Sequence, residues 1–223
     1  MNDFTTATPL RILIVDDHPI VRQGYESLIG RHADLAVCAS VSTEQEALEE
    51  IARTSPHVAI IDITLKESSG VELVKAIHKQ HDEVKMLVIS AHDENLYAER
   101  MLELGPLGYV NKQEAAEKLV EAIRKVGEGE MFVSPQIARR LQKRRAVGSN
   151  GSEPTSTIHD LTDRELQVYE MIGGGETTKY IANRLALSPK TVERYKENIK
   201  RKLGVRNATE LVQSATRWIL EKG

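Results

Sequence analysis

Short apolar runs alternate with longer helical segments throughout the first 130 residues, and this alternation limits the fold more than any other feature. The runs rich in β-branched and other apolar residues are 10–15, 35–39, 58–61, 85–90 and 108–110. The segments between them place apolar residues at three-to-four spacing, which predicts helices at 20–29, 43–53, 70–81, 94–104 and 115–127. Such alternation is typical of an α/β doubly wound fold, in which helices cover both faces of a five-stranded parallel sheet.

The charge of the chain changes sign along its length. Residues 1–142 hold 15 Lys and Arg against 23 Asp and Glu, a net charge of −8. Residues 158–223 hold 12 against 9, a net charge of +3. Two domains with different partners are therefore expected, and 223 residues are enough for both.

A polar segment separates the two halves. The basic run Lys143–Arg145 leads into residues 146–157, of which nine of twelve are Gly, Ser, Thr, Asn or Pro. This composition buries too little apolar surface to offset its ordering entropy, so a flexible tether is expected. We predict one domain at 9–130, a helical extension and linker at 131–157, and a second, small all-α domain at 158–223.

Several classes of protein are excluded or disfavoured. No apolar run approaches the roughly twenty residues of a membrane helix. The first nine residues lack a basic start followed by an apolar stretch, so we expect a cytoplasmic protein without a secretory signal. A single cysteine, Cys38, excludes an internal disulfide and a thiolate metal cluster.

Chemically distinctive side chains follow the predicted strands. They are Asp16, Asp17, Asp62, Ser90, Asn111 and Lys112. The carboxyl ends of parallel strands meet at one edge of a sheet, where ligands of such folds bind. Three carboxylates there would repel one another unless a hard cation such as Mg²⁺ lay between them. Acidic helix caps are the ordinary alternative for each Asp taken alone, but the combination favours a metal site.

These residues resemble the receiver domain of bacterial response regulators, a flavodoxin-like fold, over about residues 9–130. The resemblance implies that Asp62 accepts a phosphoryl group. It also implies that Asp17 binds Mg²⁺ directly, that Asp16 acts through water, and that Thr64 offers its backbone carbonyl to the metal. Lys112 would be the cationic partner of the phosphoryl group.

The same resemblance implies a conformational switch. Ser90 would contact the phosphoryl group, and its movement would open space that the ring of Tyr109 could fill. An ordinary half-buried strand aromatic is the alternative for Tyr109. Lys66 departs from the family, which usually has proline there, so the conformation of that loop is open.

The carboxy-terminal region predicts four short helices with explicit boundaries. Thr162 and Glu165 form a capping box, and Ser188-Pro189 is a cap followed by proline at the first helical position. Glycines end the first helix at 173–175 and the third at Gly204. Two short helices joined by a tight turn predict a helix-turn-helix whose second helix enters the major groove of double-stranded DNA.

The charges on this second helix support a nucleic-acid partner. Residues 190–206 hold seven Lys or Arg against two Glu. A solvated charged face is the ordinary alternative. However, the runs LTDRELQVYEMI and TTKYIANRLALSPKTVERYKENIKRKLGV closely resemble the LuxR-type DNA-binding domain. The whole chain thus resembles a NarL/FixJ-type response regulator.

The resemblance also assigns DNA contacts. It places Lys190, Thr191 and Lys200 near phosphates. It places Glu193, Arg194 and Glu197 near base edges, where arginine pairs with guanine and glutamate accepts from cytosine. Tyr195 stands where the family often has histidine, so its contact is open. The last helix has an apolar stripe that either serves a homodimer on DNA, as in the family, or only packs within the domain.

The leading hypothesis is a transcription regulator whose DNA binding and dimerisation respond to phosphorylation of Asp62 by a sensor histidine kinase or a small phosphodonor. A phosphatase is one rival, but the sequence at 62–64, DIT, lacks a second carboxylate to act as general acid. A DNA-binding protein controlled only by a protein partner is another rival. It would not need the full acidic set. We therefore expect no turnover enzyme.

Overall fold

The computed structural model describes residues 8–65, 70–91, 94–147, 158 and 161–220. Contacts divide the chain into two units, Met1–Ser149 and Asn150–Gly223. Within the described ranges, no helix combines the length and the apolar character that crossing a lipid bilayer requires. Lys66 lies outside the described residues, as does residue range 148–157 of the predicted tether.

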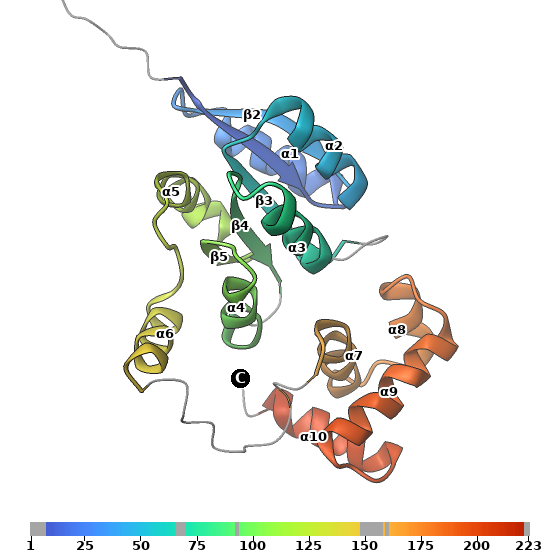
Figure 1. Ribbon diagram of the computed structural model, residues 1–223. Helices are drawn as coiled ribbons and strands as arrows, with labels where there is room; N and C mark the ends of the chain where they lie inside the picture. Colours follow the sequence, from blue (N-terminus) through green and yellow to red (C-terminus); the bar gives the residue numbers. More distant parts are fainter. Residues whose placement is uncertain (1–7, 66–69, 92–93, 148–157, 159–160, 221–223) are drawn as a thin grey trace, which may run out of the picture. The chain divides into compact units, whose positions relative to one another are not determined.

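The first unit is built on a five-stranded parallel sheet, which confirms the predicted α/β doubly wound fold (Figure 1). The strand order is β2-β1-β3-β4-β5. The bounds are β1 Leu10–Val15, β2 Leu35–Val41, β3 Val58–Asp62, β4 Lys85–Ser90 and β5 Gly108–Asn111. Strand β2 runs past its predicted end at residue 39 because Ser40 and Val41 pair with Ile14 and Val15.

Helices cover both faces of this sheet. Helices α1 and α5 pack on the face that holds Ile12, Ile14 and Ile60, and α2, α3 and α4 lie over the other face (Figure 1). The bounds are α1 Pro19–Ile29, α2 Glu44–Thr54, α3 Gly70–Gln80, α4 Glu94–Glu103 and α5 Ala115–Glu128. Each end lies within one residue of its predicted position, because the helical period and the flanking polar residues mark both boundaries.

The two central strands fix the position of the acidic residues. Ile12–Val15 of β1 are 0% exposed, and Val58–Ile61 of β3 are at most 1% exposed. Continuous apolar runs are typical of parallel strands covered on both faces. Each large side chain buried there contributes about 1.5–3 kcal/mol. Asp16 and Asp62 stand at the carboxyl ends of these rigid strands, where the chain order switches from β2 on one side of β1 to β3 on the other.

A sixth helix, α6 Pro135–Val147, follows the receiver-like part of this unit. The N–H of Phe132 donates to the carbonyl of Leu107, and the N–H of Tyr109 donates to the carbonyl of Phe132, both at 2.9 Å. Helix α6 then packs against α4 and buries Ile137. The tether prediction is wrong at its start, since residues 146–147 are helical. The leucine, alanine and arginine residues of α6 favour a helix, and the basic residues 143–145 suit its C-terminal end, so the helix continues to Val147.

The second unit contains four helices in its described part, which confirms the small all-α domain. They are α7 Asp163–Gly173, α8 Thr178–Arg184, α9 Pro189–Leu203 and α10 Ala208–Leu220. The Thr162–Glu165 capping box and the Ser188 cap are both present, and Gly204 takes the left-handed conformation at φ 66°. Helices α8 and α9 form the predicted helix-turn-helix.

Glu165 joins the first helix of this unit to the third. The residue is 3% exposed, and its carboxylate accepts the N–H of Thr162 at 2.7 Å and pairs with Lys202 Nζ at 2.6 Å. Burial alone would raise the pKa of this carboxyl, but the hydrogen bonds from Lys202 and Thr162 hold that pKa below its ordinary value of 4.5. The ionised group therefore stabilises the fold above pH 4.5, and this contribution is lost as pH falls through the folded-state pKa.

We expect Glu165→Gln to lower the free energy of unfolding of this unit by about 1–2 kcal/mol at neutral pH. The effect should shrink in acid, where the wild-type carboxyl is protonated. Trp218 is the sole tryptophan of the chain and lies in α10, so its fluorescence during urea unfolding reports on this unit. Glu176→Gln, at an exposed position, is the control. A loss that stays constant from neutral to acid pH contradicts the ionic role of Glu165.

Candidate metal centre and nucleic-acid interface

Three strands bring acidic and basic side chains together at the carboxyl edge of the sheet. Asp16 and Asp17 follow β1, Asp62 ends β3, and Lys112 follows β5. Asp16 and Asp62 are each 2% exposed. The sequence therefore predicted correctly that residues up to 96 positions apart lie together here.

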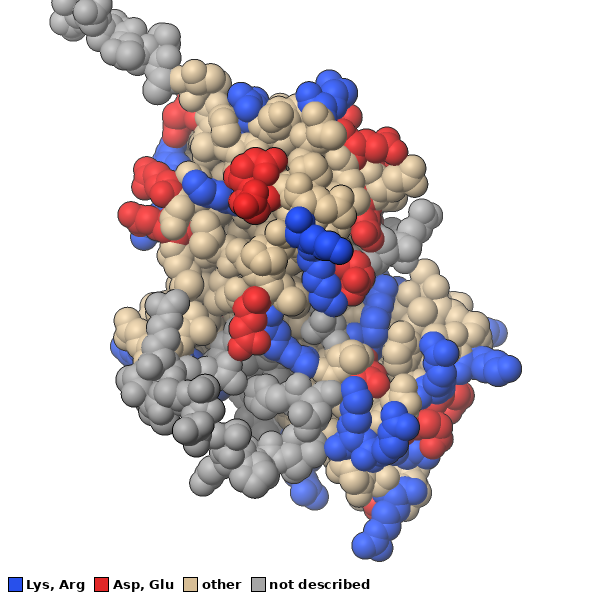
Figure 2. Space-filling model, viewed as in Figure 1, with Lys and Arg blue, Asp and Glu red and all other residues tan. Residues whose placement is uncertain are grey.

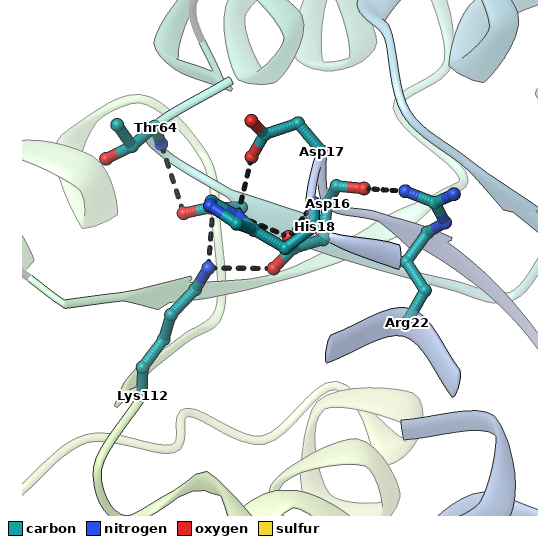
Figure 3. Close-up of polar contacts among 7 residues, drawn as sticks. Asp16, Asp17, His18, Arg22, Thr64 and Lys112 are labelled. Carbon is teal, nitrogen blue, oxygen red and sulfur yellow. Dashed lines mark hydrogen bonds and ion pairs between the residues drawn. The ribbon is translucent and has the colours of Figure 1, made fainter. Parts of the chain in front are cut away.

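Lys112 bridges two of the acids (Figure 3). Its Nζ lies 2.8 Å from Asp16 Oδ2 and 2.8 Å from Asp62 Oδ2. The other oxygen of Asp62, Oδ1, accepts the N–H of Thr64 at 3.0 Å. A Cβ at Gly70 would clash with the carbonyl oxygen of Asp62, so only glycine lets the start of α3 approach this strand end.

Two further residues contact the site, and the sequence interpretation missed both. The backbone N–H of His18 donates to Asp16 Oδ1 at 2.8 Å, and its Nδ1 lies 2.9 Å from Asp17 Oδ1. Arg22 donates from Nη1 to the carbonyl of Asp16 at 2.6 Å. Figure 3 shows His18 folded back beside the two acids and Arg22 on the outer side of Asp16. The position of His18 directly after Asp17 was the only signal for its contact.

The electrostatics of the site favour a bound cation. Burial raises the pKa of the Asp62 carboxyl, and this effect outweighs the lowering by Lys112. Burial acts to lower the pKa of Lys112, but Asp62 and Asp16 raise that pKa above its usual value. Lys112 therefore stays charged at neutral pH, and one ammonium faces more than one carboxylate.

The donor set fits a divalent metal ion. Ligand atoms of Asp16, Asp17, His18 and Asp62 all lie within 4.8 Å of one another. Carboxylate oxygens are the ligands that Mg²⁺ prefers. The backbone carbonyl of Thr64 was predicted to bind the metal. The structure shows the backbone N–H of Thr64 donating to Asp62 Oδ1. The cluster can hold a metal ion.

The predicted switch residues are both buried. Ser90, the last residue of β4, is 0% exposed, and Tyr109 of β5 is 2% exposed. The two strands pair in register, with Ser90 opposite Asn111 and Val88 opposite Tyr109. The ring of Tyr109 is thus packed in the core here and is not half-buried.

Helix α9 exposes most of the predicted DNA contacts. Lys190, Glu193, Arg194 and Glu197 are exposed, and Val192 and Ile199 are buried on the opposite face. Lys and Arg side chains gather over the part of the second unit formed by α8 and α9 (Figure 2). The helix has one polar face for a partner and one apolar face for the domain.

Several of these side chains also make contacts within the domain. Glu193 Oε1 accepts the hydroxyl of Thr178 at 2.8 Å and pairs with Lys196 Nζ at 3.0 Å. The Thr178 hydroxyl lowers the pKa of the Glu193 carboxyl, with help from Lys196. This network joins α8 to α9, and no residue pattern pointed to it beforehand.

The two remaining phosphate candidates are also engaged. Lys200 Nζ pairs with Glu197 Oε1 at 2.7 Å, and the Thr191 hydroxyl shares a hydrogen bond with the Ser188 hydroxyl at 2.7 Å. The guanidinium of Arg194 lies 6.0 Å from the centre of the Tyr195 ring. Arg194 has no carboxylate partner among the described residues, so its donors are available to a ligand.

The apolar stripe of α10 is buried only in part. Leu211 and Ala215 are buried, and Trp218 packs against Tyr169 of α7 with ring centres 5.4 Å apart. Val212 of the same stripe is 46% exposed, and Leu220, outside the stripe, is 74% exposed. Packing within the domain therefore covers only part of the stripe.

Known families match both units. The family of response regulator receiver domains matches residues 12–124, and the luxR family of bacterial regulatory proteins matches residues 159–215. The chain belongs to the response regulators. As a response regulator with a LuxR-type DNA-binding domain, it is a transcriptional regulator, as the sequence predicted.

Relatives match this response regulator over nearly its whole length. The transcriptional regulatory protein UhpA of Escherichia coli is 34% identical, over 92% of this chain and 96% of UhpA. The response regulator GacA of Pseudomonas protegens is 31% identical, over 93% of this chain and 96% of GacA. The order of the two domains is thus shared with these relatives.

Solved structures match as well. A LuxR-family two-component response regulator from Aurantimonas sp. is 34% identical, with a TM-score of 0.57 over 62% of this chain and 99% of that one. RcsB of Salmonella typhimurium, 23% identical, gives a TM-score of 0.66 over 95% of this chain and 98% of that one. At that identity, RcsB supports the fold alone.

Proposed function

We propose that this response regulator accepts a phosphoryl group on Asp62, from a sensor histidine kinase or a small phosphodonor, and thereby changes its dimerisation and its binding to specific DNA sites. The bridge from Lys112 to Asp62 and Asp16 carries the proposal. The proposed parts are a receiver at 9–130, an extension and linker at 131–157, and a DNA-binding domain at 158–223.

The chemistry uses the groups at the strand ends. An oxygen of the Asp62 carboxylate forms a bond to phosphorus while the donor's bond to phosphorus breaks, and the donor leaves with the electron pair. Lys112 Nζ neutralises the phosphoryl oxygens, and a Mg²⁺ held by Asp17, Asp62, the Thr64 carbonyl and, through water, Asp16 would supply further positive charge. The phosphoryl group adds about −1.5 to −2 charges beside Ser90.

The signal would then act through a two-state change in the receiver. Ser90 and Tyr109 lie on the two strands at one edge of the sheet, β4 and β5. We propose that Ser90 approaches the phosphoryl group and that repacking of Tyr109 accompanies the change. The exposed Val212 and Leu220 of α10 supply apolar surface for a homodimer on DNA.

The test is uptake of one phosphoryl group. The full-length protein is incubated with a small phosphodonor, with Mg²⁺ or with a chelator, and its intact mass and DNA affinity are measured. We expect the mass of one phosphoryl group only with Mg²⁺, together with altered DNA affinity. No added mass contradicts the proposal. Steady release of phosphate in excess over protein would favour the rival phosphatase.

We expect two substitutions in α9 to differ in their effect on DNA binding. Arg194→Ala should cost roughly 1–3 kcal/mol on cognate DNA and relax discrimination at one base pair, because its free guanidinium can pair with guanine. Lys200→Ala should weaken binding to all DNA sequences alike, since contacts with phosphates carry no sequence information. Binding of both variants to cognate and scrambled duplexes distinguishes the roles. Equal losses on both duplexes for Arg194→Ala would contradict base readout.

A further inference from the structure

Helix α6 concentrates positive charge on an otherwise acidic unit. Its thirteen residues contain five Lys or Arg and no Asp or Glu. Residues 1–134 hold 13 Lys and Arg against 23 Asp and Glu, a net charge of −10. Among the described residues of the helix, Ile137 is buried, and the helix packs against α4. The net positive charge of α6, on a unit that is otherwise acidic, therefore suits a negatively charged partner outside the unit.

The exposed basic residues lie on one side of the helix. The period of 3.6 residues places positions 139, 140 and 143 within about 100° of one another on a face away from Ile137, whereas position 144 lies two turns from Ile137 on the same side of the helix as that residue. Arg139 and Arg140 are exposed and, with Lys118 of α5, line an open cavity of about 560 Å³ beside α4. We use the name α6 basic face for the side of the helix that carries Arg139 and Arg140.

The acidic residues around this cavity are already engaged. Glu94 accepts a hydrogen bond from the Ser134 hydroxyl, and Glu114 pairs with Lys118 at 3.0 Å. In the described part of the chain, Arg139 has no carboxylate partner. Arg139 is therefore an exposed cation of the α6 basic face that no described carboxylate neutralises.

Chain connectivity keeps this face close to any DNA that the second unit holds. Ten residues, 148–157, separate Val147, the last residue of α6, from Ile158. A chain of that length spans at most about 40 Å. Binding of the second unit thus raises the local concentration of phosphates around α6. DNA phosphates would repel the acidic surface of the first unit. They would attract α6, so α6 is the part of the unit most suited to contact the DNA.

We propose that the α6 basic face binds phosphates of the DNA duplex beside the site held by α9, as a second contact without sequence preference. Guanidinium groups suit this role because they hydrogen-bond phosphate oxygens in pairs and stay charged. This inference rests on the proposed DNA binding by the second unit. It adds a contact from an element outside the LuxR-type domain.

The test is the salt dependence of DNA binding by the full-length protein. The variant Arg139→Gln/Arg140→Gln/Lys143→Gln is compared with wild type on a labelled duplex of scrambled sequence. We expect the slope of log K against log salt to fall by about 0.9 for each phosphate that the variant no longer neutralises, up to about 2.7 in all. Affinity at low salt should drop about 10- to 100-fold. Arg139→Lys/Arg140→Lys should bind nearly as wild type does.

A matched control removes the same charge elsewhere on the unit. Arg31→Gln/Lys75→Gln/Lys79→Gln alters three cations outside α6 and should leave the slope near the wild-type value. Equal slopes for the α6 variant and this control overturn the inference. The inference would also be overturned if the α6 variant bound DNA as wild type does but no longer bound phosphatidylserine vesicles that wild type binds. That result would indicate a membrane partner.

Two readouts separate the possible failures. Wild type that does not bind DNA at all contradicts the proposed function, whereas wild type that binds with the slope of the α6 variant contradicts only this inference. Phosphoryl uptake and circular dichroism check that the variant is folded. If the triple variant does not fold, Arg139→Gln alone should still reduce the slope by about 0.9, and an unchanged slope overturns the inference.

Discussion

Asp62→Asn is expected to abolish phosphoryl uptake while the receiver stays folded. An amide cannot act as the nucleophile toward phosphorus, so no added mass should appear with phosphodonor and Mg²⁺. Asparagine keeps the shape of the side chain and can still accept the N–H of Thr64, which lies 3.0 Å from Asp62 Oδ1 in the wild type. The free energy of unfolding should change by no more than about 1 kcal/mol, because one negative charge fewer relieves repulsion with Asp16.

The measurements are the intact mass and the thermal unfolding of the full-length protein, with and without Mg²⁺. The variant should also show a smaller Mg²⁺-dependent rise in the unfolding temperature, since one carboxylate of the donor set is missing. Asp34→Asn is the matched control, because Asp34 pairs with Arg124 at 2.8 Å on the surface and should leave uptake unchanged. Full uptake by Asp62→Asn would mean that another residue is the acceptor.

The sequence predicted the receiver fold well because its strands and helices have different periods. The apolar runs of β1 and β3 and the helical spacing between them set bounds that the structure reproduces closely. The departures have local causes. Ser40 continues β2 although it is polar, because it pairs with Ile14. Residues 146–147, predicted as the start of the tether, continue α6, and Ala146 is a strong helix former.

The site was predictable only in part. The shared edge of a parallel sheet was enough to bring Asp16, Asp62 and Lys112 together. The sequence did not show that His18 contacts both Asp16 and Asp17. The direction of a side chain that follows a strand depends on the local turn. For the same reason, Glu193 was predicted only as a base reader, whereas its contact with Thr178 depends on the angle between α8 and α9.

Lys112→Met is expected to impair both phosphoryl uptake and stability. Loss of the ammonium that lies 2.8 Å from Asp62 Oδ2 removes a positive charge from the place where the phosphoryl oxygens gather. Removal of one such electrostatic group typically costs about 10²- to 10³-fold in rate, and we expect a loss of that size. The rate of mass gain with phosphodonor and Mg²⁺ measures it.

The stability effect of Lys112→Met should depend on the metal. Without Mg²⁺, Asp16 and Asp62 lose their shared cation while 2% exposed, so the free energy of unfolding should fall by about 3 kcal/mol. Saturating Mg²⁺ should restore much of this stability, because the ion also neutralises the acids, but it should not restore the rate of uptake.

A matched control separates a buried cation from an exposed one. Lys118→Met removes the partner of Glu114, in an exposed pair at the start of α5, and should cost less than about 1 kcal/mol of stability while phosphoryl uptake stays normal. Urea unfolding followed by circular dichroism, with Trp218 fluorescence to identify the transition of the second unit, measures both variants. Equal losses of stability for the two variants would mean that the bridge between Asp16 and Asp62 contributes no more than a surface ion pair, and the electrostatic account of this site would then be wrong.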